Sequence, residues 1–130
     1  MSVVVGYVPT PEGEAALRAG VRAAGDLSAE LVVVNVESTR KQRPAEESGT
    51  LPALNRILEE SRVSHLLVHP VGDFDASEEI LKAVEEHSAR LVVLGLRHRT
   101  PVGKLFLGST AQRVLLEAAC PVLAVKAGQA

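Results

Sequence analysis

The sequence predicts an α/β fold, in which a doubly wound parallel sheet of the Rossmann or flavodoxin type has helices on both faces. Short valine-rich runs that are continuous rather than alternating are typical of strands buried on both faces. Segments with apolar residues at helical spacing separate these runs. Strand and helix therefore alternate along all 130 residues, a length that suits one domain, 1–130.

The first strand and helix are expected at the N-terminus. Val3–Val8 is a continuous apolar run that ends at Pro9. Thr10 suits the N-cap of a helix because its hydroxyl can accept a backbone N–H, and Pro11 suits the first helical position. Apolar residues at helical spacing continue this helix as far as Gly25.

The middle of the chain contains two further strands and a helix. Leu31–Val36 and Ser64–Val71 are predicted as strands from their apolar runs. Between them, Glu37–Thr50 has no apolar period and is rich in polar residues, so we expect a mobile surface loop. A second helix is expected to open at Thr50 and Pro52.

Two more pairs of strand and helix complete the chain. Asp75–Glu78 has the spacing of a capping box and starts a helix, and Leu91–Leu94 is the fourth strand. Ser109 and Gln112 also have capping-box spacing, so Ser109 is predicted as the N-cap of the last helix. Pro121–Val125 is the fifth strand and is expected at an edge of the sheet.

Composition excludes several classes of protein. Only 2% of the residues are aromatic, which leaves few side chains to stack on single-stranded nucleic acid. No apolar run approaches the roughly 20 residues of a membrane span, and the N-terminus lacks the basic region of a signal peptide. Cys120 is the only cysteine and has no partner for a disulfide. We therefore expect a cytoplasmic protein that binds neither nucleic acid nor membranes.

The connection after the fourth strand is the first candidate for a ligand site, because ligands of open parallel sheets bind at the carboxyl ends of strands. It is unusually long, it contains Gly95 and Gly108, and the N–H groups and hydroxyls of Ser109 and Thr110 suit an anion. Residues 90–113 hold five Arg or Lys and no Asp or Glu, so the rest of a chain with net charge −2 carries −7. A nucleotide fits this charge pattern best. The plainer alternative is a solvated basic loop.

The stretch 95–110 resembles the ATP-binding signature of the universal stress protein family. That signature is Gly, two residues, Gly, nine residues, Gly, then Ser or Thr, and here Arg99–Leu107 are the nine residues before Gly108. The rest of the chain is similar to the family from end to end, including Val3–Leu17 and the closing segment Cys120–Lys126.

This resemblance implies a parallel sheet with strand order 3-2-1-4-5 and a role in stress response rather than catalysis. It also implies a homodimer, whose interface the apolar strand Val122–Val125 would form. It also implies a bound adenine nucleotide, ATP above all or else ADP or AMP, with any Mg²⁺ held only through the phosphates. The residues expected at the nucleotide are Tyr7, Val8, Pro9, Thr10, Val36, Leu94, Gly95, Arg97, His98, Arg99, Gly108, Ser109 and Thr110.

Two positions depart from the family pattern. His98 stands in place of the second glycine, and Val8 stands where nucleotide-binding relatives carry Asp. Arg97 and Arg99 flank His98 and can make charge-assisted bonds to phosphate. Three interpretations stay open: nucleotide binding, which we favour, a dimeric interaction protein with a vestigial phosphate loop, and a slow ATPase.

Other candidate sites have simpler explanations. His65 and His69 flank a predicted strand, where histidines are far commoner than an isolated two-ligand metal site. Ser109 lacks the Gly-x-Ser-x-Gly elbow of a nucleophile. Cys120 lies at a helix-to-strand junction, where a buried thiol usually acts as a small hydrophobe. We therefore expect no metal site and no catalytic residue.

Overall fold

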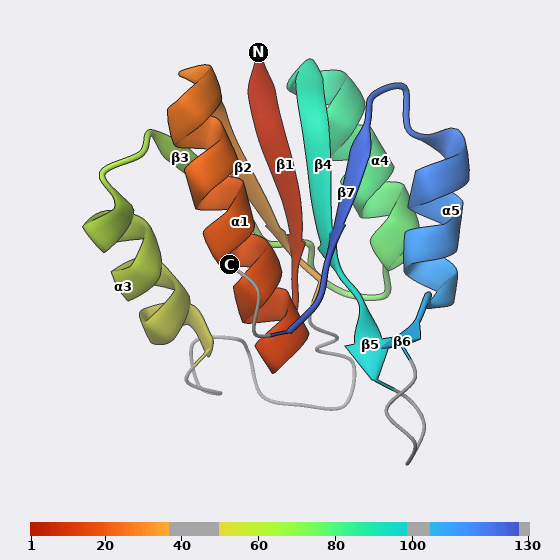
Figure 1. The fold of residues 1–130 in the computed structure, drawn as a ribbon. Helices are drawn as coiled ribbons and strands as arrows, with labels where there is room; N and C mark the ends of the chain where they lie inside the picture. Colours follow the sequence, from red (N-terminus) through yellow and green to blue (C-terminus); the bar gives the residue numbers. More distant parts are fainter. Residues whose placement is uncertain (37–49, 99–104, 128–130) are drawn as a thin grey trace.

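A parallel sheet forms the centre of the structure, a computed structural model that describes residues 1–36, 50–98 and 105–127. Its strands pair only in parallel, in the order β3-β2-β1-β4-β7. They are β1 (Ser2–Tyr7), β2 (Glu30–Asn35), β3 (His65–Val68), β4 (Ala89–Gly95) and β7 (Val122–Val125). When these strands alone are counted along the chain, the order is 3-2-1-4-5, so the predicted fold class is confirmed (Figure 1).

Helices cover both faces of the sheet (Figure 1). On one face lie α1 (Pro11–Leu27) and α3 (Thr50–Ser61), and on the other lie α4 (Ala76–Glu86) and α5 (Ser109–Glu117). The buried side chains form two clusters that follow this division, because α1 and α3 supply the first and α4 and α5 the second.

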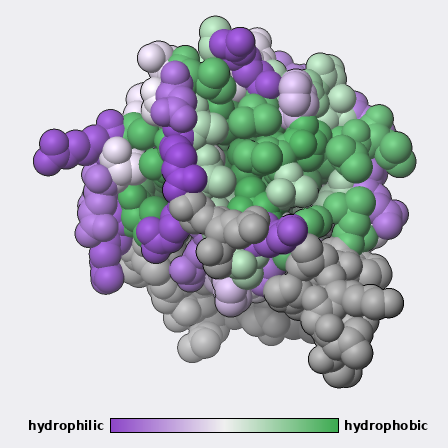
Figure 2. All heavy atoms as spheres, viewed as in Figure 1, coloured by the Kyte–Doolittle hydropathy of each residue, from purple (hydrophilic) through white to green (hydrophobic). Residues whose placement is uncertain are grey.

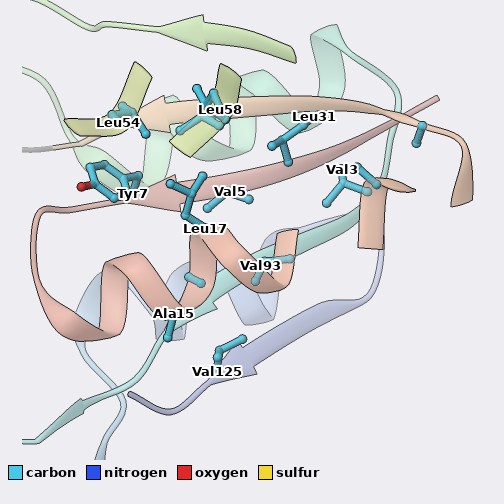
Figure 3. Close-up of a cluster of buried hydrophobic side chains, with 14 residues drawn as sticks. Val3, Val5, Tyr7, Ala15, Leu17, Leu31, Leu54, Leu58, Val93 and Val125 are labelled. Carbon is cyan, nitrogen blue, oxygen red and sulfur yellow. The ribbon is translucent and has the colours of Figure 1, made fainter. Parts of the chain in front are cut away.

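The valine run of β1 supplies both clusters. Val3 and Val5 belong to the cluster beneath α1 and α3, whereas Val4 belongs to the cluster beneath α4 and α5. Successive side chains of a strand point to opposite faces, so a continuous apolar run is what a strand covered on both sides requires. Figure 3 shows Val5 of the first cluster beside Leu17 of α1.

The caps of α1 explain where this helix begins and ends. The Thr10 hydroxyl accepts the N–H of Gly13 at 3.0 Å, which confirms the predicted N-cap. The helix runs beyond Gly25 to Leu27, and Ser28 ends it in a left-handed conformation with φ 53° and ψ 43°. Gly25 therefore lies inside the helix rather than at its end.

The prediction of Ser109 as an N-cap is wrong. Gly108 is the N-cap of α5, and Ser109 is the first helical residue. Gly108 has an extended backbone (φ −68°, ψ 168°), and no side chain caps the helix there. The Gln112 side chain donates to the carbonyl oxygen of Leu107 at 3.1 Å instead of closing a capping box. Ser109 and Gln112 have the spacing of a capping box, but that spacing begins one residue inside the helix.

A short antiparallel pair lies in the long connection after β4 and was not predicted. β5 (Arg97–His98) pairs with β6 (Leu105–Phe106). Strands of two residues are too short to leave a hydrophobic period in the sequence. The predicted mobile loop Glu37–Thr50 lies outside the described residues, except for Thr50, which begins α3.

Candidate functional site

A cavity of about 400 Å³ opens beside the carboxyl ends of β1 and β4. The strand order reverses here, since β2 lies on one side of β1 and β4 on the other. Doubly wound sheets bind their ligands at this point, in pockets of roughly 300 to 1,000 Å³. Most described lining residues are small or aliphatic; the full set is Gly6, Val8, Thr10, Glu12, Gly13, Val36, Ala76, Ile80, Leu94, Gly95, Gly108, Thr110 and Ala111.

Three helices begin at this cavity, because α1, α4 and α5 all contribute residues from their N-terminal ends to the lining. Thr10 caps the first turn of α1, and the Asp75 carboxylate caps α4 by accepting the N–H of Ser77 at 2.9 Å. The start of α5 has no such side-chain cap. Unbonded N–H groups and the positive end of the helix dipole favour an anion, so α5 offers the anion-binding end of the cavity.

Two glycines bring the first turn of α1 against the sheet. A Cβ atom at Gly95 would lie 2.5 Å from the carbonyl oxygen and 2.8 Å from the Cβ of Glu12. A Cβ atom at Gly13 would overlap the carbonyl oxygen of Val8. Only glycine allows both approaches, and they place the start of α1 at the ends of β1 and β4, where it forms one wall of the cavity.

The structure brings together more than half of the predicted site residues. Those that line the cavity are Val8, Thr10, Val36, Leu94, Gly95, Gly108 and Thr110. Pro9 and Ser109 are exposed and are not among the lining residues. Tyr7 is buried, and Figure 3 shows its ring in the cluster that contains Leu17 and Leu54. Arg99 lies outside the described residues, as do the side chains of Arg97 and His98.

Sequence reasoning missed six lining residues, which are Gly6, Glu12, Gly13, Ala76, Ile80 and Ala111. Gly6 and Ile80 have the periodicity of core positions, and nothing in that pattern distinguishes a core wall from a cavity wall. Glu12, Gly13, Ala76 and Ala111 lie in first turns of helices. A signal for these was present, because helices that follow parallel strands start at the carboxyl edge of the sheet, where ligands bind.

Two of the five positively charged residues in the segment 90–113, Arg90 and Arg113, do not face the cavity as the sequence suggested. Arg90 is the second residue of β4, a strand whose other end is at the cavity, and it donates to the sulfur of Met1 at 3.3 Å. Arg113 is held among carboxylates, as described next. The count of five positive charges therefore overstated the positive charge beside the cavity. The sequence did not reveal that Arg90 lies at the end of β4 away from the cavity.

Arg113 ties α5 to the start of α4. Its guanidinium donates to the hydroxyl of Ser77 at 3.2 Å and forms ion pairs with Glu117 at 3.1 Å, Glu78 at 3.5 Å and Asp75 at 3.7 Å. The Glu117 carboxylate raises the pKa of Arg113, with smaller contributions from the other carboxylates. The hydrogen bond from the Ser77 hydroxyl, more than the Arg113 charge, lowers the pKa of Asp75. This cluster links α5 to the start of α4, two of the three helices that begin at the cavity.

Cys120, His65 of β3 and His69, which follows β3, have local explanations. Cys120 packs against the cluster beneath α4 and α5, and burial raises the pKa of its thiol, which disfavours the reactive thiolate. The Nδ1 atom of His65 lies 2.9 Å from the carbonyl oxygen of Val63, and that of His69 lies 3.4 Å from the amide nitrogen of Asn35. In the described residues, no three His, Cys, Asp or Glu side chains come together as a metal site.

Comparison with known proteins identifies the family. The sequence profile of the universal stress protein family matches residues 1–126. The chain belongs to the universal stress protein family. It is 44% identical over 126 residues to a universal stress protein of Mycolicibacterium smegmatis, and the alignment covers 95% of this chain and 96% of the relative.

Solved universal stress proteins have the same fold. One from Archaeoglobus fulgidus superimposes with a TM-score of 0.79 at 26% identity and covers 97% of this chain and 98% of its own. A structure from the same organism in complex with dAMP has a TM-score of 0.75 at 22% identity, with coverage of 97% and 98%.

Proposed function

We propose that this universal stress protein binds an adenine nucleotide, ATP above all, in the cavity at the ends of β1 and β4. It would act there as a cytoplasmic stress-response or regulatory module of one domain, residues 1–130. The observation that carries this function is an α5 start without a side-chain cap that opens on a largely apolar cavity. In the described parts of the chain, no helix is both long and apolar enough to cross a membrane.

The phosphates are expected at the start of α5. Gly108 and Thr110 line the cavity there, so the first-turn N–H groups and the Thr110 hydroxyl are within the same wall. A helix N-terminus offers several N–H donors and a positive dipole end to one anion. Arg97 and Arg99 are the side chains expected to bring positive charge to the phosphates.

The adenine is expected among aliphatic side chains. Val36, Ile80 and Leu94 line the cavity, and none of its described lining residues is aromatic. The N–H of Val36 donates to the carbonyl oxygen of Tyr7 at 3.0 Å, which fixes Val36 beside the end of β1. The base would therefore be held by dispersion contacts rather than by ring stacking.

Relatives of known structure support an adenine ligand. Besides the dAMP complex from Archaeoglobus fulgidus, a universal stress protein solved in complex with cAMP shares the fold with a TM-score of 0.70 at 20% identity. A family member from Arabidopsis thaliana with AMP bound has a TM-score of 0.65 at 15% identity. These likenesses concern the fold, and the adenine ligand is carried to this chain as part of the proposal.

Binding rather than turnover is expected. Phosphoryl transfer needs metal ions on the β and γ phosphates and a group that positions the attacking water. Among the described lining residues, Glu12 is the only carboxylate, and the Thr10 hydroxyl already caps α1. Any Mg²⁺ would be held through the phosphates, and ATP hydrolysis would be slow and incidental.

Mass spectrometry of the freshly purified protein after denaturation tests the function. Release of ATP, ADP or AMP is the expected result, together with heat on titration of the emptied protein with ATP. Absence of any adenine nucleotide, combined with no heat at millimolar ATP, would exclude nucleotide binding.

Such a result would favour the second candidate, a homodimeric interaction protein. β7 is an edge strand on which Leu123 is 43% exposed, and Leu116 of the neighbouring α5 is 84% exposed. Figure 2 shows hydrophobic surface gathered on the side of the molecule where β7 and α5 lie. An exposed apolar edge invites strand pairing, so a second copy covering Val122–Val125 is compatible with either function.

A further inference from the structure

Glu12 is an acidic residue in a cavity wall whose other described residues are uncharged. It is the second residue of α1, it is half-buried, and it is the only ionisable side chain among the described lining residues. Its backbone lies against Gly95 at the end of β4, which fixes the helix turn that carries it.

The carboxylate of Glu12 differs from the acidic groups that pair across α4 and α5. In the described parts of the chain, it has no ion pair and no hydrogen bond, whereas Asp75, Glu78 and Glu117 all pair with Arg113. Glu14, in the same helical turn, is exposed and does not line the cavity. Both residues complement the dipole of α1, but of the two only Glu12 lines the cavity.

An ionised carboxylate only accepts hydrogen bonds, so the ligand group beside Glu12 must donate them. The negative charge of Glu12 disfavours phosphates beside it. The uncapped start of α5 is where the phosphates are expected to bind. An adenine nucleotide carries neighbouring hydroxyl donors on its ribose. Thr10, the N-cap of α1, also lines the cavity, and its hydroxyl oxygen already accepts the N–H of Gly13.

We propose that Glu12 binds the ribose hydroxyls and makes the cavity selective for ribonucleotides over nucleotides that lack them. This inference rests on the proposed nucleotide binding and adds the residue that recognises the sugar. A hydrogen bond to a charged group, once lost, changes affinity by on the order of 10-fold to 100-fold.

The ratio of the dissociation constants for 2′,3′-dideoxy-ATP and ATP tests this inference, because a ratio cancels the repulsion between Glu12 and the phosphates. The wild-type protein should prefer ATP by about 10-fold or more. In Glu12→Ala the ratio should fall close to one. In the matched variant Glu14→Ala, which also removes one charge from the first turn of α1, the preference should remain.

Each other outcome is decisive. An unchanged ratio in Glu12→Ala, or an equal fall in Glu14→Ala, would overturn the role of Glu12 and leave nucleotide binding intact. A wild-type protein that binds ATP and dideoxy-ATP equally would overturn it as well. A wild-type protein that binds neither would overturn the proposed function and this inference together.

Discussion

Gly95 shows how one residue determines both packing and site geometry. Its missing side chain allows the end of β4 to touch the backbone of Glu12, and the same contact forms a wall of the cavity. The sequence motif pointed to Gly95 as a phosphate-loop glycine, and the structure adds a packing reason for it.

Gly95→Ala is expected to destabilise the protein by about 1–3 kcal/mol, because its Cβ would meet backbone that cannot move aside cheaply. Gly25→Ala is the matched control: a Cβ there meets nothing within 4 Å, and the position is helical. That variant should gain roughly 0.5–1 kcal/mol. Urea denaturation measures both, and a loss of the same size in the two variants would contradict the steric explanation.

Individual site residues were predictable where a motif or a cap marked them. Gly95, Gly108 and Thr10 were found this way and line the cavity. Glu12 was not, because an acidic residue in a first helical turn is what the helix dipole alone favours. Only the packing of α1 against β4 shows that Glu12 lines the cavity.

At the scale of elements, exposed charges join α4 to α5 in addition to the apolar contacts of the cluster beneath them. Asp75 caps α4 through the N–H groups of Ser77 and Glu78 and also pairs with Arg113 of α5. These bonds favour the ionised carboxylate and lower its pKa. Because the pKa is lowered on folding, the contribution of Asp75 is complete above about pH 4 and is lost at lower pH.

Asp75→Ala should therefore lower the melting temperature at pH 7, and the difference from the wild type should shrink as the pH falls below about 4. Asp26→Ala, at the carboxyl end of α1 where the dipole disfavours an acidic side chain, should not lower it at pH 7. Thermal melts between pH 3 and pH 7 measure this. A difference between Asp75→Ala and wild type that grows on acidification would contradict the assigned bonds.

Long periodic elements were predictable and short ones were not. α1 and the valine strands follow from spacing and caps, whereas β5 and β6 pair through two residues each and leave no pattern. β3 ends at Val68 rather than Val71, since Pro70 lacks the N–H that would continue the ladder. The start of α5 was displaced by one residue because Gly108, not Ser109, takes the cap conformation.

For the whole molecule, alternation of buried strands and amphipathic helices was sufficient to predict the doubly wound sheet. It also leaves two edges, β3 and β7, of which the sequence predicted β7, through Val122–Val125, as the interface. Leu66 of β3 is 41% exposed and Leu123 of β7 is 43% exposed, so the two edges carry comparable apolar side chains. Leu115 and Leu116 of α5, the helix that precedes β7 in the chain, are exposed as well, which favours the β7 edge for a second copy.

Leu123→Asp is accordingly expected to convert a dimer into a monomer, because a charge would be buried in the interface. Leu66→Asp, with the same change on the opposite edge, should remain dimeric. Size-exclusion chromatography with light scattering measures the mass of each. Dissociation caused by Leu66→Asp alone would assign the interface to β3, and an unchanged mass for Leu123→Asp would exclude β7.

The central claim, an adenine nucleotide whose phosphates lie at the start of α5, is tested most directly by calorimetric titration of Gly108→Val with ATP. Gly108 has an extended backbone that any residue adopts, so valine adds bulk to the cavity wall without straining the chain. The account predicts a variant that still folds, with a melting temperature lowered by the poorer N-cap, and an affinity for ATP at least about tenfold weaker than that of the wild type. A folded variant that binds ATP as tightly as the wild type would contradict it.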